Sequence, residues 1–349
     1  MSTITRILLL QVIIVIITSY VVYLARQPND PVTAEEILKD GGDYVVTPDG
    51  RFIEYFICGD DDNNNATTNW VYMQHGYGSN GKFIHHLPNI CREAKMNNLR
   101  LFSPSMPGFG MSTNHPIGTT RKLQDWPNDV QLIIDKLGIQ KFYASGTSTG
   151  CVHAFVVAHA FPDKILGIGV NTPTAPLAVE SSVSQIAPIT KYLRMLLEYD
   201  YIRDVLGWLM SKLPVEQRLK AAPDVAAALD KMLEIGEPWM VESHAGWIAD
   251  QSRGVVKGHR GWSDTMATIN EDLPFPTNEL NFVHEKGMKF AITSARDDRT
   301  NPPQMQAYWA NAIKGVEIIS RPEGWGHVHG SVPGCFDEIY KRMMVDPVQ

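Results

Sequence analysis

The residues with the clearest chemical potential in this chain are a serine between two glycines, Gly146-Thr147-Ser148-Thr149-Gly150. An apolar run that opens at Lys141 precedes them, and a helix-like pattern follows as far as Phe161. Where a strand turns sharply into a helix, a serine at this spacing presents its hydroxyl as a nucleophile. The glycines fit such a turn because strand and helix pass close together, and a Cβ would crowd the backbone. We therefore predict that Ser148 is a nucleophile.

A serine nucleophile at neutral pH needs a base, usually histidine, and the histidine needs a carboxylate that holds its tautomer. Two loops near the end of the chain, each after a strand-like run, contain such residues: Asp297 and Asp298 in the first, His327 in the second. Catalytic groups of an open α/β sheet lie beyond the carboxyl ends of its strands. The predicted set is Ser148, Asp298 and His327, in the order Ser, Asp, His.

The segments that must position these residues alternate between short strand-like and longer helix-like patterns. Strands are expected in the run that opens at Lys141 and at 44–46, 51–58, 70–74, 100–103, 165–170, 289–293 and 316–319. Helices are expected after the serine turn and at about 82–97, 120–137, 303–313 and 333–344. This alternation predicts an α/β fold with a mostly parallel, doubly wound sheet and crossover helices.

The alternation stops over residues 174–286, where the pattern is mostly helical and rich in tryptophan and methionine. The sheet pattern resumes afterwards, so this stretch is predicted to be a helical cap inserted into a core of residues 43–173 and 287–349. Tryptophan and methionine side chains are typical both of ordinary packing between helices and of the walls of substrate-binding sites. Which of them face the site stays open.

Composition limits the class of protein. The chain has 349 residues, of which 44% are hydrophobic and 20% charged, as in globular proteins with a large core. A net charge of −7 gives no basic surface for nucleic acid. The sequence does not decide the oligomeric state.

Neither the cysteines nor the histidines indicate a metal or cofactor. The four cysteines have no CxxC pair and are too few for a disulfide scaffold; we expect mostly small buried apolar groups, with a disulfide between two of them left open, at Cys58, Cys91, Cys151 and Cys335. The histidines without the H-E-x-x-H spacing of a zinc helix are expected to be ordinary helix residues: His85, His86, His153 and His159.

The N-terminal stretch predicts a membrane segment. Residues 7–24 carry no charge and are flanked by Arg6 and Arg26. As a helix they would span about 27 Å, close to the hydrocarbon thickness of a bilayer. We therefore predict an uncleaved signal anchor over residues 1–26 and a single-pass membrane protein, with a polar linker over 27–42. A cleaved signal and a secreted protein are the alternative, and one arginine on each side leaves the orientation open.

One glycosylation sequon, Asn65-Ala66-Thr67, lies in a run of aspartate and asparagine that predicts a surface loop. In a lumenal or extracellular domain, Asn65 would be a glycosylation candidate. A chance occurrence in an asparagine-rich loop is the alternative, and both stay open.

Taken together, the motifs resemble the α/β-hydrolase fold superfamily, in its lipase, esterase and epoxide-hydrolase-like "fold 1" branch, over about residues 45–345. His75-Gly76 after a strand is similar to the oxyanion segment of that family, and residues 104–112 are similar to its PDxPGxGxS loop, with Ser105 in place of the aspartate. The serine turn resembles the family's GxSxG elbow. Residues 295–302 resemble its acid loop, residues 326–327 its histidine loop, and 260–264 a segment before the acid strand.

The resemblance implies roles for individual residues. Ser148 would be the nucleophile, and the acid would be Asp298 when the acid loop is aligned on its proline, or Asp297 when it is aligned on its serine. The proline is the firmer anchor. His327 follows a glycine, as the family's base does, and His329 is the alternate. The oxyanion donors would be the backbone N–H groups of Tyr77 and Thr149.

The nucleophile narrows the predicted chemistry. Relatives that open epoxides or dehalogenate carry aspartate at the elbow, so Ser148 argues for acyl transfer through an acyl-enzyme. We predict a carboxylesterase- or lipase-like serine hydrolase that acts on an ester with an apolar or lipid-like part and needs no cofactor. Amide, thioester or carbon–carbon bond hydrolysis by the same residues, and a small-molecule receptor on the same fold, are the alternatives.

Overall fold

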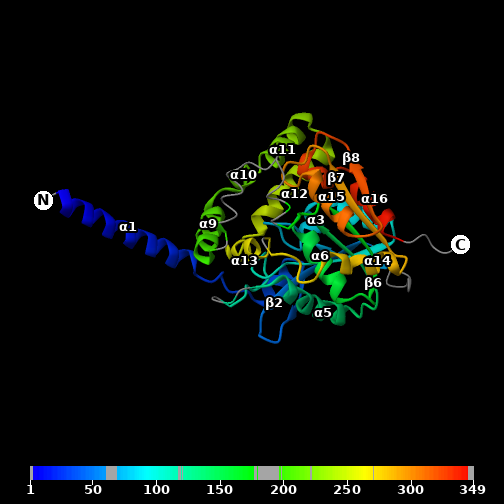
Figure 1. The fold of residues 1–349 in the computed structure, drawn as a ribbon, viewed down its shortest axis with the longest axis horizontal. Helices are drawn as coiled ribbons and strands as arrows, with labels where there is room; N and C mark the ends of the chain where they lie inside the picture. The colour runs from blue at the N-terminus through cyan, green and yellow to red at the C-terminus, as the bar shows by residue number, and fades with distance from the viewer. Residues whose placement is uncertain are drawn as a thin grey trace.

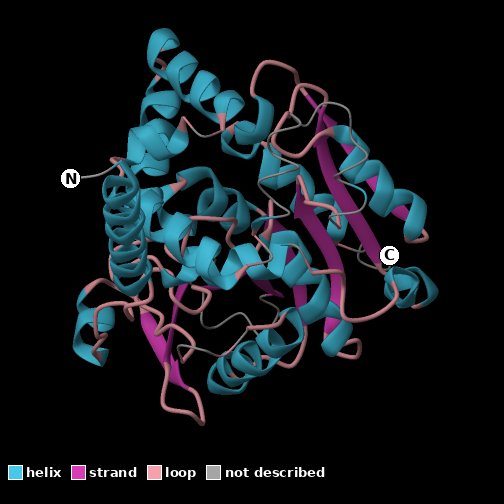
Figure 2. Ribbon diagram, turned by 60° about the vertical axis from the view of Figure 1, so that its left-hand side comes forward, coloured by secondary structure: helices cyan, strands magenta, loops and turns pink. Residues whose placement is uncertain are grey.

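A single eight-stranded sheet forms the centre of the protein (Figures 1 and 2). The computed structural model describes residues 3–59, 69–116, 119, 121–176, 179, 196, 197, 199–220, 222–269 and 271–344. The strands are β1 (Asp43–Val46), β2 (Phe52–Gly59), β3 (Asn69–Gln74), β4 (Leu99–Pro104), β5 (Phe142–Thr147), β6 (Ile165–Asn171), β7 (Lys289–Ala295) and β8 (Val316–Arg321). They coincide closely with the strand-like runs of the sequence.

The sheet is mixed, with order β1-β2-β4-β3-β5-β6-β7-β8. β1 pairs antiparallel with β2, and β2 antiparallel with β4, whereas the strands from β4 to β8 run parallel. The predicted mostly parallel α/β sheet is thus confirmed, with an antiparallel edge. Because the parallel strands all end at one edge, the loops after β3, β5, β6, β7 and β8 come together there.

Helices cover both faces of the sheet (Figure 2). One face carries α3 (Phe83–His86), α4 (Pro88–Met96) and α16 (Cys335–Met343), whose apolar side chains form one core cluster with the sheet. The other carries α5 (Trp126–Leu137), α6 (Gly150–Ala160), α14 (Phe282–Glu285) and α15 (Pro303–Ala312) around the larger cluster. Burial between two helical layers accounts for the nearly continuous buried runs of the central strands β5 and β6.

The described part of the segment between β6 and β7 is mostly helical and covers one end of the sheet (Figure 1). Before α14 its described elements are α9 (Asp200–Lys212), α10 (Val215–Leu219), α11 (Pro223–Ile235), α12 (Pro238–Arg253), α13 (Arg260–Ile269) and the 3₁₀ turn η2 (Thr277–Asn281). α11 and α12 share a small apolar cluster with Val328 of the 3₁₀ turn η3 (Gly326–Ser331). The cap is therefore packed directly on the loop that follows β8.

The N-terminal membrane anchor is a prediction that the structure contradicts. A membrane span needs about 20 consecutive apolar residues in one helix, and no helix in the described ranges is both long and apolar enough. The predicted transmembrane segment, and the single-pass membrane localisation drawn from it, are therefore wrong. The first helix, α1 (Thr3–Ala25), ends against the cap, where His259 Nε2 donates to the Ala25 carbonyl oxygen (2.7 Å) and Arg26 pairs with Asp204 (3.3 Å).

The chain after α1 also contacts the folded domain. α2 (Ala34–Lys39) begins with a capping box formed by Thr33 and Glu36. Asp30 N–H donates to the Lys257 carbonyl oxygen (2.6 Å) in the cap loop between α12 and α13. Residues 27–42, predicted to be a polar linker, thus include a helix and contacts with the cap.

Two of the four cysteines are joined. Cys58 on β2 and Cys91 on α4 form a disulfide, whereas Cys151 and Cys335 are free and buried. Sequence spacing could not select this pair, because the two residues meet only when α4 packs on the sheet. The sequon at Asn65 lies outside the described residues.

Candidate active site

The turn after β5 holds Ser148 in a backbone conformation that is rare for a residue with a side chain, with φ of 55°. Its two glycines are needed for space. A Cβ on Gly146 would lie 2.7 Å from the Gly150 carbonyl oxygen, and one on Gly150 would lie 2.3 Å from the His75 carbonyl oxygen. The Ser148 N–H donates to the Asn171 carbonyl oxygen (2.9 Å) on β6. The turn therefore has the geometry of a nucleophile elbow.

Ser148, His327 and Asp298 come together from three loops at the carboxyl edge of the sheet. Ser148 Oγ lies 3.1 Å from His327 Nε2. On the other side of the ring, His327 Nδ1 donates to Asp298 Oδ2 at 3.0 Å. Asp298 is 1% exposed, so water does not compete for this carboxylate. The arrangement can move a proton from the serine hydroxyl to the imidazole while the carboxylate holds the ring.

The alternate acid, Asp297, has a different set of contacts. Its Oδ2 accepts from the backbone N–H groups of Gly324 (2.7 Å) and Gly326 (3.1 Å). It therefore fixes the loop that carries His327, and no contact with the imidazole is formed.

The alternate base, His329, has hydrogen-bond partners other than Ser148. Its Nδ1 donates to the Gly326 carbonyl oxygen (2.9 Å), and its Nε2 lies 3.2 Å from Thr293 Oγ1 on β7. Burial lowers the pKa of His329 to about 4. This ring is thus neutral and bound at both nitrogens, behind the loop that presents His327.

The electrostatics of His327 are set by two carboxylates. Burial lowers its pKa, but the charge of Asp298 and the hydrogen bond to it, with a smaller contribution from Asp224, raise the pKa above its ordinary value. Asp298 comes from the core and Asp224 from helix α11 of the cap. Both stabilise a positive charge on the imidazole, which forms when the ring accepts a proton.

The two predicted oxyanion donors are free. Within the described residues, neither the Tyr77 N–H nor the Thr149 N–H donates to another group of the protein. Gly76 lies against Ser148, because a Cβ there would be 3.2 Å from Ser148 Cβ. The Tyr77 side chain packs on Trp262 of the cap, with ring centroids 4.9 Å apart. Two unpaired N–H groups beside the Ser148 hydroxyl suit a developing oxyanion.

His75 holds the loop that carries Tyr77. The ring is fully buried, its Nδ1 donates to the Gly76 carbonyl oxygen (2.8 Å), and its Nε2 accepts from Met106 N–H (3.0 Å). Burial lowers its pKa to about 3, so it stays neutral. Nearby, Ser105 Oγ donates to Glu54 (2.5 Å) and accepts from Gly81 N–H (2.7 Å). Ser105, which stands where the family's loop has aspartate, thus makes hydrogen bonds that hold the structure and none to Ser148, His327 or Asp298.

Sequence reasoning missed two residues that complete the relay. Asn301 N–H donates to Asp298 Oδ1 (2.7 Å), and its Nδ2 donates to the Thr172 carbonyl oxygen (2.7 Å). Thr172 follows β6 with a φ of 46°, and its Oγ1 lies 3.2 Å from His327 Nδ1. The polar residue just past the end of β6 was a signal that could have been used for Thr172.

A third missed residue belongs to the cap. Asp224 accepts hydrogen bonds from the backbone N–H groups of Arg299 (3.1 Å) and Thr300 (3.1 Å) and from Thr300 Oγ1 (2.8 Å). These bonds hold the loop that carries Asp298. The cap thus positions part of the core, and nothing in the spacing of residues near Asp224 indicates this.

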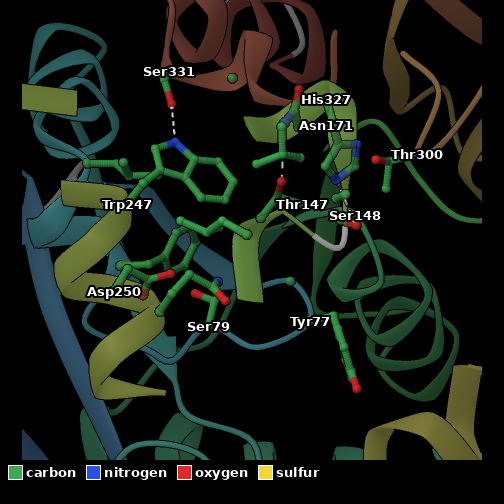
Figure 3. A pocket seen from close by; sticks show the side chains of 18 of the residues that line it. Tyr77, Ser79, Thr147, Ser148, Asn171, Trp247, Asp250, Thr300, His327 and Ser331 are labelled. Carbon is green, nitrogen blue, oxygen red and sulfur yellow. Dashed lines mark hydrogen bonds between the residues drawn. The ribbon is translucent and has the colours of Figure 1, made fainter. Parts of the chain in front are cut away.

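The site opens into a cavity of about 310 Å³ between core and cap (Figure 3). Ser148, His327 and Thr300 lie on one side, and Trp247, Asp250 and Ser79 lie on the other. Most of the lining is apolar, and the cap contributes three of its large side chains to it: Met210, Trp247 and Trp262. Within the described ranges, no group of three or more His, Cys, Asp or Glu side chains could hold a metal ion.

Comparison with known proteins agrees with this architecture. A family model for the alpha/beta hydrolase fold matches residues 69–194. The fold is similar to that of a hydrolase from Pseudomonas aeruginosa PA01 (TM-score 0.58, 14% identity, 85% of this chain and 96% of that chain covered). It is also similar to a thermophilic esterase from Thermogutta terrifontis (0.55, 16%, 86% and 97%) and to naproxen esterase from Bacillus subtilis (0.55, 16%, 93% and 96%).

No curated protein matches the sequence significantly. The eight-stranded sheet, the elbow after β5 and the inserted cap define an α/β-hydrolase architecture. The family model over residues 69–194 and the solved structures support this fold assignment. At these identities the likeness to the solved structures is one of fold.

Proposed function

We propose that the protein is a serine hydrolase that cleaves carboxylic esters through an acyl-enzyme. The single observation that carries the proposal is the relay from Ser148 Oγ through His327 to Asp298, with distances of 3.1 and 3.0 Å. In the proposed reaction His327 takes the serine proton while Oγ attacks the ester carbonyl carbon. The same imidazolium then protonates the departing alcohol.

The second half of the reaction uses the same groups. Water attacks the acyl-enzyme, His327 accepts a proton from that water, and the carboxylic acid leaves as Ser148 regains its proton. The N–H groups of Tyr77 and Thr149 receive the negative oxygen at each tetrahedral stage. An apolar cavity of about 310 Å³ beside Ser148 supports a small apolar ester as substrate. Two of the structures with a similar fold are described as esterases.

A fluorophosphonate probe tests the nucleophile directly, because it reacts with activated serines. We expect labelling of the folded protein and none of Ser148→Ala. Turnover of 4-nitrophenyl esters should fall about a million-fold in that variant, as it does when a serine protease loses its nucleophile. Thr147→Ala, a neighbouring hydroxyl removed from the same turn, is the matched control and should keep labelling.

The outcomes separate the alternatives. Absence of Ser148-dependent labelling in folded protein would overturn the proposal. Rapid labelling with negligible turnover across ester chain lengths would also overturn it, and would favour a small-molecule receptor. Turnover of amides or thioesters in preference to esters would keep the mechanism and replace the substrate.

A further inference from the structure

One buried charge in the cavity has nitrogens without a hydrogen-bond acceptor among the described residues. Arg218, on cap helix α10, lines the same cavity as Ser148 and is only 8% exposed. Its Nε and Nη1 are shielded from solvent, and within the described residues neither has a hydrogen-bond acceptor. Arginine stays protonated in proteins, and a buried charge without a partner is costly. This is a site prepared for an anion.

The packing around Arg218 holds its guanidinium in place. It lies over the Trp262 ring, with Cζ 5.8 Å from the ring centroid. Trp262 in turn packs on Tyr77, whose N–H is a proposed oxyanion donor. Burial lowers the pKa of Arg218, and the charge of Glu216 opposes this shift only in part. A stacked ring supports the guanidinium plane but accepts none of its N–H bonds.

We propose that the cavity receives esters that also carry a carboxylate, and that Arg218 binds this carboxylate. The inference rests on the proposed ester hydrolysis. A carboxylate matches the planar fork of a guanidinium with two parallel hydrogen bonds. Among the described lining residues Arg218 is the only lysine or arginine. One positive charge balances one carboxylate, whereas a phosphate monoester carries nearly two negative charges.

The acidic residue of the cavity does not occupy this site. Asp250 Oδ1 accepts from Asn80 Nδ2 (2.9 Å) and lies 3.8 Å from His86 Nδ1. Burial raises the pKa of Asp250, which weakens its tendency to carry a charge. Asp250 lies beside Ser79, across the cavity from Thr300 and His327 (Figure 3). Its hydrogen bonds are thus directed at the core, and Arg218 keeps its N–H groups for a ligand.

The experiment compares matched esters that differ only in charge. One pair is 4-nitrophenyl octanoate and the mono-4-nitrophenyl ester of octanedioic acid, repeated with chains of six and ten carbons. A second pair places the charge on the alcohol side: phenyl and 4-carboxyphenyl hexanoate. The selectivity, kcat/KM for the charged member over the neutral member, is measured for wild type and Arg218→Met. Dividing one selectivity by the other cancels intrinsic reactivity.

We expect Arg218→Met to lower the selectivity about 30-fold or more in at least one pair, as loss of one partner of a buried ion pair does. Lys220→Gln removes an exposed charge two residues away and should leave the selectivity unchanged. Arg218→Met should melt no lower than wild type, because it removes an unpaired buried charge. Equal loss on both members, or a lower melting temperature with unchanged selectivity, would overturn the inference and leave Arg218 as a packing residue on Trp262.

A binding measurement separates this inference from the proposed function. Ser148→Ala is titrated by calorimetry with octanoate and with its neutral isostere, octanamide. Tighter binding of octanoate, lost in Ser148→Ala/Arg218→Met, supports the anion site even where no ester is turned over. Ser148-dependent ester turnover without any preference for a carboxylate would overturn the inference while the proposed function stands.

Discussion

The core and the cap meet at one cavity but treat their buried polar groups differently. In the core, both oxygens of Asp298 accept hydrogen bonds, one from Asn301 and one from His327. In the cap, two guanidinium nitrogens of Arg218 have no hydrogen-bond acceptor within the part of the chain that the structure describes. The groups proposed to perform chemistry are thus fixed before a substrate enters, whereas the group proposed to select a substrate is bound only when the substrate arrives.

The cap also shapes the core. Asp224 holds the acid loop with three hydrogen bonds, and Val328, beside His327, belongs to the apolar cluster of α11 and α12. The inserted segment therefore serves two purposes: it walls the cavity, and it fixes two of the loops that carry the relay. Substitutions in the core and in the cap can separate these two contributions.

The largest expected effect is a loss of kcat that separates Asp298 from its neighbour Asp297 in the acid loop. Asp298→Asn should lower kcat about ten-thousand-fold, because an amide no longer holds the imidazole in the tautomer that accepts the serine proton. Asp297→Asn keeps an oxygen that can accept from Gly324 and Gly326, so kcat should fall less than about tenfold. Steady-state kinetics on one ester measure both. Similar losses would mean that loop geometry, and not the Asp298 contact, limits the rate.

The next effect concerns stability. The disulfide Cys58–Cys91 joins β2 to α4 in the core, and residues 174–286 contain no cysteine. Closing a loop across 33 residues restricts the unfolded chain by about 3–4 kcal/mol. The double variant Cys58→Ser/Cys91→Ser should lose about that much free energy of unfolding in urea. A reducing agent should lower the stability of wild type to the same extent and leave the variant unchanged. Any other pattern would show that the disulfide does not contribute this free energy of unfolding.

Gly246 on α12 and Gly254, which directly follows that helix, allow the same change to be made at two places where the cap touches the core. A Cβ on Gly246 would lie 2.0 Å from the His86 carbonyl oxygen, and one on Gly254 would lie 2.0 Å from the Gly78 carbonyl oxygen. Gly78 follows Tyr77, the proposed oxyanion donor. Each alanine should destabilise the protein by about 1–3 kcal/mol through overpacking. Only Gly254→Ala should also lower kcat, by about 10- to 100-fold, since small misplacements of a donor are costly.

The control for this pair is Ser252→Ala on the exposed side of the same helix, which should change neither quantity by much. Thermal unfolding and kcat are measured on all three proteins. An equal loss of kcat in Gly246→Ala would show that the whole cap, rather than its contact with the Tyr77 loop, sets the oxyanion geometry.

The sequence alone predicts the parts of this molecule that local patterns specify. The eight strands, the elbow and the loops with Asp298 and His327 follow from apolar periodicity, glycine spacing and the rule that strand ends carry the site. Ser148 was identifiable because its turn constrains its neighbours: a glycine is required on both sides for steric reasons.

The remaining features arise where distant segments meet. Asn301 reaches Thr172 across 129 positions of sequence, and the disulfide pairs two cysteines 33 residues apart. Arg218 has no distinguishing pattern in sequence, because its lack of a hydrogen-bond acceptor among the described residues depends on everything packed around it. Such contacts depend on tertiary packing, which no local window contains. The apolar residues 7–24 show the reverse error, since composition predicted a membrane span there that the structure contradicts.

The smallest expected effect concerns the pKa of His327, to which the core contributes Asp298 and the cap contributes Asp224. His327 must be neutral to accept the serine proton, and its pKa is raised above 6.5 by Asp298 and, less, by Asp224. Since the raised pKa keeps the ring protonated to higher pH, kcat/KM should rise tenfold per pH unit up to a midpoint above 6.5. Asp224→Asn removes a negative charge contributed by the cap, so the midpoint should move to lower pH.

A control variant shows whether the loss of any carboxylate near His327 would shift the midpoint. Glu323 is an exposed carboxylate that pairs with Arg296 (3.3 Å). Because solvent screens it, Glu323→Gln should leave the midpoint in place. A midpoint that stays fixed in Asp224→Asn would show that the cap acts on the relay only by holding the loop at Thr300. A downward shift confined to Asp224→Asn would show that the cap also tunes the charge of the base.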